Sequence, residues 1–331
     1  MKIFTDADAS LTPLEGKTVA ILGYGNQGRA QALNLRDSGA TVIVGNRRDA
    51  YYEQAQADGF DPMPIVDAAA AGDFLFILTT DESQPLIWEN QIAPGIAADN
   101  TLVWSSGYNV GYDLIIPPAH VDVVMVAPRM TGIMVRNLFE HGKGAMAQIA
   151  VQQDASGEAW ARMMAVAMGI GATRGGAFVS SFREEAELDL FAEQVVWAGL
   201  VAWMEECFAL GVEEGFAPEL MVLELYASGE AAEILAMMAK NGFYKQMAHH
   251  STTSQYGTLS RARHLLTDET RDRMRKSLIE DIKAGAFAEE WRQEQAGGAG
   301  RLQELMAQAM DSPMSRAEDE VIPLVQSAHG L

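Results

Sequence analysis

The sequence predicts an α/β domain with a doubly wound, mostly parallel sheet, followed by an all-α C-terminal domain. Short apolar runs alternate with helix-like segments between Lys17 and Ala127, and strand candidates become scarce after Ala159. The 331 residues exceed what one hydrophobic core usually serves, so two domains are expected.

The α/β pattern begins with the apolar run from Lys17 to Leu22, which is typical of a short buried strand. A glycine-rich turn follows this strand directly and leads into a helical pattern from Arg29 to Ser38. Later apolar runs are separated by helix-like segments at the spacing of βα units, which favours parallel strands. These runs are Thr41 to Gly45, Phe74 to Leu78, Leu102 to Trp104 and Val121 to Ala127.

The second half of the chain has a different character. From Ala159 onward it is rich in Ala and Met at helical spacing, so we expect helices there. The change falls between Gln148 and Arg183, and we take residues 1–182 as the α/β domain and 183–331 as the helical domain.

Composition narrows the possible partners. The formal net charge of −21 disfavours nucleic acids and anionic membrane surfaces, because both would repel the chain. Met1 to Asp6 lacks the basic and apolar regions of a secretory signal, and no run of about 18 uninterrupted apolar residues occurs. We therefore expect a cytoplasmic protein.

The turn after the first strand is the clearest motif. Strand, three spaced glycines and helix together form the context of a dinucleotide-binding fingerprint, which predicts a Rossmann domain. The first glycine makes the tight turn, the second lets the backbone approach a pyrophosphate, and the third allows close helix packing. The predicted cofactor-binding residues are Gly23, Tyr24, Gly25, Asn26, Gln27 and Gly28.

The end of the second strand bears on the choice between NADP and NAD. Arg47 and Arg48 suit a 2′-phosphate, which favours NADP, or are simply two solvated charges. Asp49 has the opposite effect, because a carboxylate repels that phosphate and accepts a hydrogen bond from a free 2′-hydroxyl. The sequence leans toward NADP and leaves the choice open.

An acidic stripe stands out in the helical region. Glu185, Asp189 and Glu193 recur at every fourth residue, so in an α-helix all three point the same way. Closely stacked carboxylates repel one another, which indicates a cation beside them. Oxygen ligands without Cys or His suit a hard ion such as Mg²⁺. The alternative is a solvated acidic face in an acidic protein.

At this point the chain resembles short, class I ketol-acid reductoisomerases over nearly its whole length. That family implies an N-terminal Rossmann domain, a knotted all-α C-terminal domain that carries metal, substrate and dimer contacts, two Mg²⁺ ions, and a homodimer with active sites at its interface. Its reaction is an alkyl migration in a small acetohydroxy acid followed by NADPH reduction to a 2,3-dihydroxy acid. The matching motifs are residues 23–28, 77–82, 124–128, 153–157, 189–194 and 217–219.

The resemblance transfers roles to several intact positions. Asp189 matches the metal-bridging aspartate and Glu193 the second metal carboxylate. Glu224 matches a glutamate supplied by the partner subunit, and Ser251 matches the serine that contacts the substrate carboxylate. Thr79 and Gly107 lie in matched motifs and are assigned to the cofactor side.

Four changes in the presumed pocket depart from the family pattern. Met130 to Ile133 replace a Gly-Pro-Gly-His run, and three single positions differ. Ser106 stands where the family has His. Arg129, a permanently charged planar fork, stands where the family has Lys, a compact ammonium. Ser228 stands where the family has its second partner-supplied glutamate, and a serine cannot act as a carboxylic acid at neutral pH. We count all three among the candidate catalytic residues.

These departures lead to a hypothesis of altered chemistry. The chain is expected to be a divergent, Mg²⁺- and nicotinamide-dependent enzyme that transfers hydride and rearranges a small 2,3-dihydroxy or ketol acid, in specialised metabolism. One family member closes a sulfonium dihydroxy acid to a cyclopropanol, as in malleicyprol assembly. The pattern of lost pocket residues suggests that the chain is similar to this member. The alternatives are the housekeeping reductoisomerase of branched-chain amino acid synthesis and an inactive cofactor-binding homologue.

Overall fold

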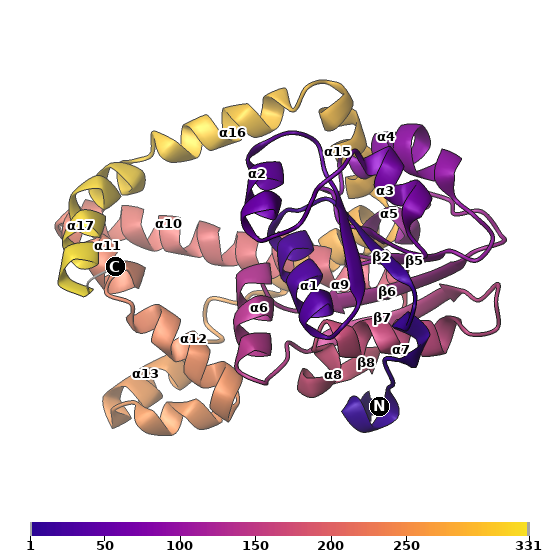
Figure 1. Ribbon diagram of the computed structural model, residues 1–331. Coiled ribbons are helices and arrows are strands. Elements are labelled where there is room, and N and C mark those ends of the chain that lie inside the picture. The colour runs from indigo at the N-terminus through magenta and orange to yellow at the C-terminus, as the bar shows by residue number, and fades with distance from the viewer. Residues whose placement is uncertain (1, 330–331) are drawn as a thin grey trace. The chain divides into compact units, whose positions relative to one another are not determined.

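The chain forms two compact units in the computed structural model, which describes residues 2–329 (Figure 1). The first unit runs up to Asp189 and the second begins at Leu190. The first contains the sheet and the second is helical, which confirms the predicted fold class.

The described residues of the first unit build an eight-stranded sheet in the order β1-β8-β7-β6-β5-β4-β2-β3. The five strands from β6 to β3 in this order are parallel, as the βα spacing predicts. β7 is antiparallel to β6 and parallel to β8, and β1 is antiparallel to β8. The strands are Ile3–Phe4 (β1), Thr18–Leu22 (β2), Thr41–Gly45 (β3), Phe74–Ile77 (β4), Thr101–Trp104 (β5), Asp122–Pro128 (β6), Ala147–Gln153 (β7) and Ala177–Val179 (β8).

Three strands, β1, β7 and β8, are absent from the sequence prediction. β1 and β8 have two and three residues, too few for an alternating pattern to be visible. The helical pattern that begins at Ala159 does not lie wholly in the second unit. Its first helix, α7 (Ala159–Gly169), packs against β6 and β7 and belongs to the sheet domain.

The order of the strands creates a switch point between β2 and β4. The chain leaves β2 toward β3 on one side and returns to β4 on the other, so a crevice opens at the carboxyl ends of these two strands. In doubly wound sheets ligands bind in this crevice. The fold therefore places the residues after β2, β4, β5 and β6 at one edge.

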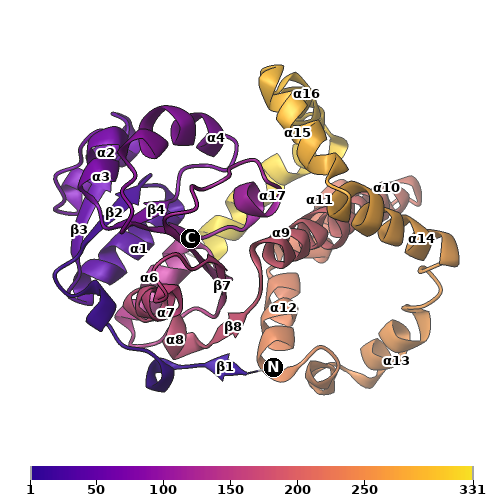
Figure 2. The same ribbon diagram turned by 90° about the vertical axis from the view of Figure 1, so that its right-hand side faces the viewer.

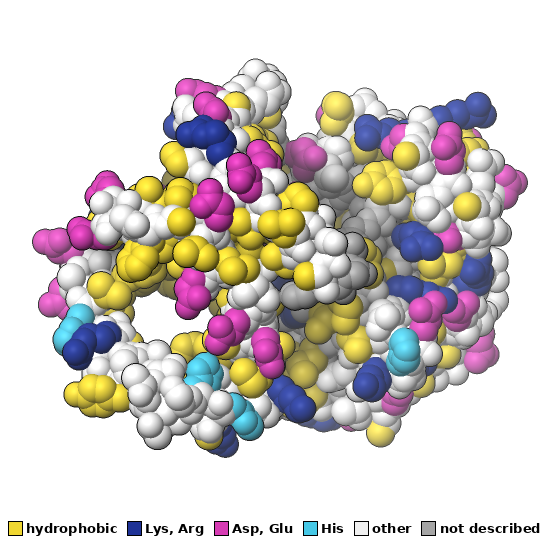
Figure 3. Space-filling model, turned by 90° about the vertical axis from the view of Figure 1, so that its left-hand side faces the viewer, with side chains coloured by type: hydrophobic (Ala, Val, Ile, Leu, Met, Phe, Trp, Pro, Cys, Tyr) yellow, Lys and Arg dark blue, Asp and Glu magenta, His cyan; other side chains and the backbone are white. Residues whose placement is uncertain are grey.

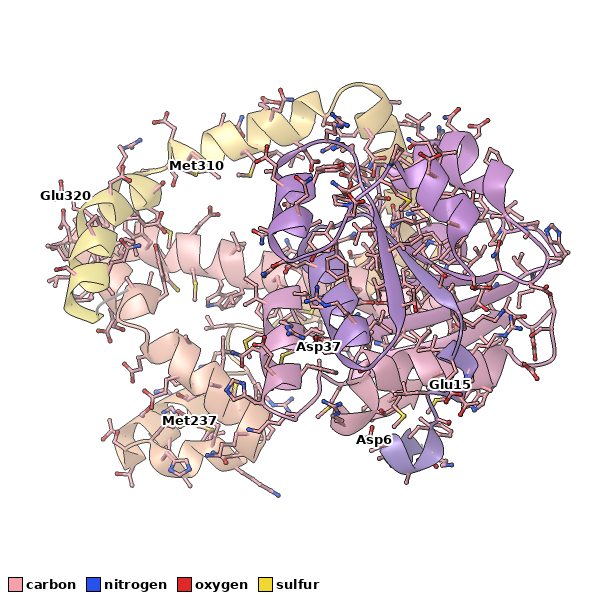
Figure 4. All side chains as sticks on the ribbon, in the orientation of Figure 1. Asp6, Glu15, Asp37, Met237, Met310 and Glu320 are labelled. Carbon is pink, nitrogen blue, oxygen red and sulfur yellow. The ribbon has the colours of Figure 1, made fainter. Side chains whose placement is uncertain are left out.

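Helices cover both faces of the sheet (Figure 2). One core packs Val19 and Ile21 of β2 against Leu35 of α1 and Met163 of α7. The opposite core holds Trp104 against α3 and the first residue of α9. Asp37, labelled in Figure 4, is the last residue of α1, and its Oδ2 forms an ion pair with Nη1 of Arg136 on α6 at 2.7 Å. The remaining helices of this unit are α1 (Asn26–Asp37), α2 (Ala50–Ala57), α3 (Ile65–Ala71), α4 (Gln84–Ile87), α5 (Tyr108–Gly111), α6 (Gly132–Glu140), α8 (Ala172–Gly175) and α9 (Phe182–Phe191).

The second unit has a small core of its own. Phe208, Val222 and Val321 bring together α10, α11 and α17, and are less than a tenth exposed. The helices include three π-helical segments, η5, η6 and η8. The elements are η5 (Ala192–Trp197), α10 (Ala198–Glu213), α11 (Pro218–Val222), η6 (Leu223–Ala227), α12 (Glu230–Asn241), η7 (Lys245–His249), α13 (Thr252–Arg261), α14 (Asp268–Lys276), η8 (Ser277–Lys283), α15 (Ala286–Ala296), α16 (Gly300–Met310) and α17 (Pro313–His329).

Much apolar surface remains uncovered on the second unit. Trp197, Val201 and Trp203 are about half exposed, and Leu220 is 61% exposed. In the view of Figure 3 many apolar side chains lie at the surface next to acidic ones. The continuous helical stretch Phe182–Glu213 is long and apolar enough to cross a membrane by length and composition, which a helix that meets another protein surface also satisfies.

Candidate active site

The glycine turn has the geometry that dinucleotide binding needs. Gly23 has a φ of +103°, and a Cβ there would lie 2.7 Å from the backbone nitrogen of Thr79. A Cβ on Gly28 would lie 2.0 Å from the carbonyl oxygen of Gly23, so only glycine lets α1 begin here. A Cβ on Gly25 meets nothing within 4 Å, which leaves open space above the N-terminus of α1. A pyrophosphate fits this space.

Neighbouring loops hold this turn in place. The backbone amide of Tyr24 donates to Asn46 Oδ1 at 3.0 Å, and Gln27 Nε2 donates to the carbonyl oxygen of Met130 at 2.8 Å. A Cβ on Gly132 would lie 1.9 Å from the carbonyl oxygen of Asn26, so the starts of α1 and α6 touch. The buried Thr79 hydroxyl has no protein partner, which suits a polar ligand at the switch point.

Asp49 is the N-cap of α2. Its Oδ1 accepts from the backbone amides of Tyr51 at 3.0 Å and Tyr52 at 3.2 Å, and its Oδ2 accepts from Arg47 Nε at 2.7 Å. Arg47 is therefore already paired, and the guanidinium of Arg48 lies 5.9 Å from the ring centre of Tyr52. A 2′-phosphate would have to share Arg47 with a carboxylate, whereas a free 2′-hydroxyl could donate to Asp49.

The carboxyl ends of β5 and β6 contribute Gly107 and Arg129. A Cβ on Gly107 would lie 2.0 Å from the carbonyl oxygen of Phe182, so glycine is needed for α9 to start beside this loop. The amide of Gly107 donates to Glu185 Oε2 at 2.6 Å. Ser106 accepts at 3.2 Å from the backbone amide of Tyr108, which gives its hydroxyl a local structural role.

Arg129 joins two carboxylates of α9. Its Nη1 donates to Glu185 Oε1 at 2.6 Å, and its Nη2 donates to Asp189 Oδ1. The Glu185 side chain is 2% exposed, and burial raises its pKa to about 7, although the Gly107 amide and Arg129 act in the opposite direction. The same two carboxylates raise the pKa of the Arg129 guanidinium. The expected cation beside the acidic stripe is thus, in part, a side chain of the protein itself.

The stripe is less uniform than an ideal α-helix predicts. Glu185 is buried, Asp189 is 44% exposed at its side chain, and Glu193 is exposed. The helix also changes to π winding at Ala192, so Glu193 leaves the regular i, i+4 register. Single π turns occur frequently at functional sites.

Three candidates lie in the second unit. Glu224 is exposed on the π-helical η6. Ser228 follows it, and its hydroxyl accepts from the Glu230 amide at 3.4 Å near the start of α12. Ser251 is the N-cap of α13 and accepts from the Ser254 amide at 3.2 Å, so its hydroxyl proton remains able to bond a carboxylate.

The donor set fits one hard divalent ion better than two. Asp189 and Glu193 offer carboxylate oxygens, which Mg²⁺ prefers. Arg129 already holds one oxygen of Asp189, and residues 2–329 contain no group of three or more His, Cys, Asp or Glu side chains placed to hold a metal. These ligand assignments remain predictions.

Comparison with known proteins settles the family. A family model described as "Acetohydroxy acid isomeroreductase, NADPH-binding domain" matches residues 13–176, and one described as "Ketol-acid reductoisomerase, C-terminal domain" matches residues 182–326. The chain belongs to the ketol-acid reductoisomerase family. It is thus an NAD(P)-dependent oxidoreductase/isomerase by family, as the sequence predicts.

Individual relatives support the same family. The chain is 44% identical to "Putative ketol-acid reductoisomerase 3" of Saccharolobus solfataricus, across 97% of this chain and 98% of that one. It is 42% identical to "Ketol-acid reductoisomerase (NADP(+))" of Pyrobaculum calidifontis, across 98% of each. A solved "NADH-preferring ketol-acid reductoisomerase from an uncultured archean" superposes with a TM-score of 0.92 at 34% identity, over 98% of this chain and 99% of that one.

The structure also identifies a residue whose role the sequence left unassigned. Glu185 is part of the acidic stripe, but only the fold shows that it is buried and holds Arg129 and the Gly107 loop. Its apolar neighbour Ala186 and the start of α9 at Phe182 were the available signal, since both lie on the buried side of the helix.

Proposed function

We propose that this chain is a nicotinamide- and Mg²⁺-dependent ketol-acid reductoisomerase that acts on a small acetohydroxy acid. The observation that carries the proposal is the common edge of the sheet. The open glycine turn follows β2 there, the unpartnered Thr79 hydroxyl follows β4, and Arg129 follows β6. The names of the relatives support the housekeeping activity better than a role in specialised metabolism.

The residues of the site have distinct tasks in this reaction. The N-terminus of α1 and Gly25 receive the pyrophosphate. Asp189 and Glu193 would hold Mg²⁺, which when bound polarises adjacent oxygens of a ketol acid. Arg129 keeps a permanent positive charge beside the position where negative charge develops on the substrate, and Glu185 orients that guanidinium.

A two-substrate assay tests the proposal. The purified protein is given Mg²⁺, NADPH or NADH, and either 2-acetolactate or the 3-hydroxy-2-keto acid that the alkyl shift would produce. Oxidation of the reduced nicotinamide with both substrates is the expected result. Asp189→Asn should abolish it, because a neutral amide is a poor ligand for Mg²⁺. Absence of turnover with either substrate would overturn the proposal.

A second candidate is a changed carbon rearrangement, in specialised metabolism, such as closure of a sulfonium dihydroxy acid to a cyclopropanol. Two observations favour it. The guanidinium of Arg129 contacts two carboxylates. Ser228, at the position of a family glutamate, accepts from the amide of Glu230 at the start of α12. Conversion of such a sulfonium acid, with 2-acetolactate left unchanged, would support it. The opposite result would eliminate it.

We also infer that the protein is a cytoplasmic homodimer whose copies pair through the second unit. Three apolar side chains of this unit, Trp197, Val201 and Leu220, are about half or more exposed, and the core of the unit is small. A patch of this kind is typical of a protein interface. Light scattering should give a dimer, and Trp197→Asp should shift it toward monomer. Leu86→Asp, at an apolar residue of the first unit that is 69% exposed, is the matched control.

A further inference from the structure

Arg129 forms ion pairs with two carboxylates of α9. One guanidinium contacts carboxylates on two successive turns of the helix, through Nη1 to Glu185 and through Nη2 to Asp189. The backbone of Arg129 is itself fixed, because its amide donates to the carbonyl oxygen of Met146 at 2.8 Å. The side chain therefore holds both carboxylates from a rigid edge of the sheet.

A divalent ion that binds Asp189 has to compete with this contact. Breaking this contact should cost a competing ion about tenfold in affinity, which is about 1.4 kcal/mol. Arginine keeps its proton at every working pH, so its charge remains beside the ion after the contact is broken. A second ion at Asp189 would meet the same cation.

We propose that Arg129 competes with metal for Asp189, and that the chain consequently binds one divalent ion. The inference rests on the Mg²⁺ site of the proposed function. Lysine at this position would behave differently, because one ammonium cannot hold two carboxylates from the same edge in the way that the fork does. It would stay with the buried Glu185, whose charge needs a partner more, and would release Asp189.

Manganese titration tests this on the full chain. Mn²⁺ bound per chain is measured by electron paramagnetic resonance and its affinity by calorimetry, for the natural protein and for Arg129→Lys. We expect one ion per chain in the natural protein, and about tenfold tighter binding or a second ion in Arg129→Lys. Binding in the variant alone would overturn the inference, because the natural chain would then hold no ion.

Arg183→Lys is the matched control. Arg183 lies on α9, as Glu185 and Asp189 do, and donates to Glu187 at 2.7 Å. Because this ion pair does not involve Asp189, the replacement of Arg183 should leave Mn²⁺ binding unchanged. Two ions per chain in the natural protein, equal binding by the natural protein and Arg129→Lys, or no binding by either, would overturn the inference.

The proposed function fails separately. Turnover of the ketol acids is measured on the same samples. Metal binding as expected without turnover would remove the proposed function and leave the competition at Asp189 intact. Turnover with two ions per chain would do the reverse.

Discussion

Replacing Asp49 with Asn should shift cofactor preference toward NADPH. Asn keeps the N-cap, because its Oδ1 still accepts from the amides of Tyr51 and Tyr52, but it removes the charge and frees Arg47 from its 2.7 Å ion pair. A 2′-phosphate carries a charge near −2, and at about 5 Å from a carboxylate it is repelled by ~2 kcal/mol even in water. We therefore expect the ratio of NADPH to NADH affinity to rise at least tenfold. Dissociation constants measured by quenching of protein fluorescence give this ratio independently of turnover.

A matched control separates the charge at the N-cap from the general acidity of the helix. Glu53 lies on the same helix, one turn further on, and lines the same hollow as Arg48 and Asp49. Glu53→Gln removes an equal charge without touching the cap, so its effect on the ratio should be several-fold smaller. If Asp49→Asn leaves the ratio unchanged while the protein stays folded, Asp49 does not face the 2′ position and the reasoning is wrong.

Three further predictions concern the turn, the buried carboxylate and the second unit. Gly28→Ala should lower the melting temperature and abolish dinucleotide binding, because its Cβ would lie 2.0 Å from the Gly23 oxygen, whereas Gly25→Ala should weaken dinucleotide binding without unfolding; equal melting temperatures would contradict this. Glu185 has a folded-state pKa of about 7, above its usual 4.5, so its contribution to stability is complete below pH 4.5 and is lost as the pH rises through 7. In Glu185→Gln the free energy of unfolding should therefore vary less with pH in that window, by up to about 3 kcal/mol. Urea denaturation at several pH values measures this free energy, and the same pH dependence in both proteins would refute the assignment. Ser251→Ala should cost about 1 kcal/mol through the lost cap of α13 and should raise the KM for the ketol acid; loss of stability with an unchanged KM would leave Ser251 a purely structural residue.

The nucleotide-binding half shows how much a local pattern can predict. The strand ending at Leu22, the three glycines and the following helix form one contiguous signal, because each role depends on backbone conformation close along the chain. The structure confirms the parallel strands and the turn. It adds β7 and the two short strands β1 and β8. The pairing of β1 with β8 joins residues more than a hundred positions apart, which is not visible in short windows.

The acidic turn shows the limit of such patterns. Spacing predicts that Glu185 and Asp189 share a helix face, and α9 confirms this. Spacing does not predict that Arg129, 56 positions before Glu185, reaches both of them, or that Glu185 is buried against Gly107. The sequence therefore indicates a cation at this position without revealing that the protein supplies one.

By itself the sequence determined the fold class, the dinucleotide turn and the family, because these depend on periodicity and on contiguous motifs. The tertiary structure alone decided the partners of Arg129 and Asp49, and hence which charges remain for a metal or a phosphate. The physical reason is that a charge acts through what surrounds it. Burial and pairing are set by segments that meet only when the sheet has formed.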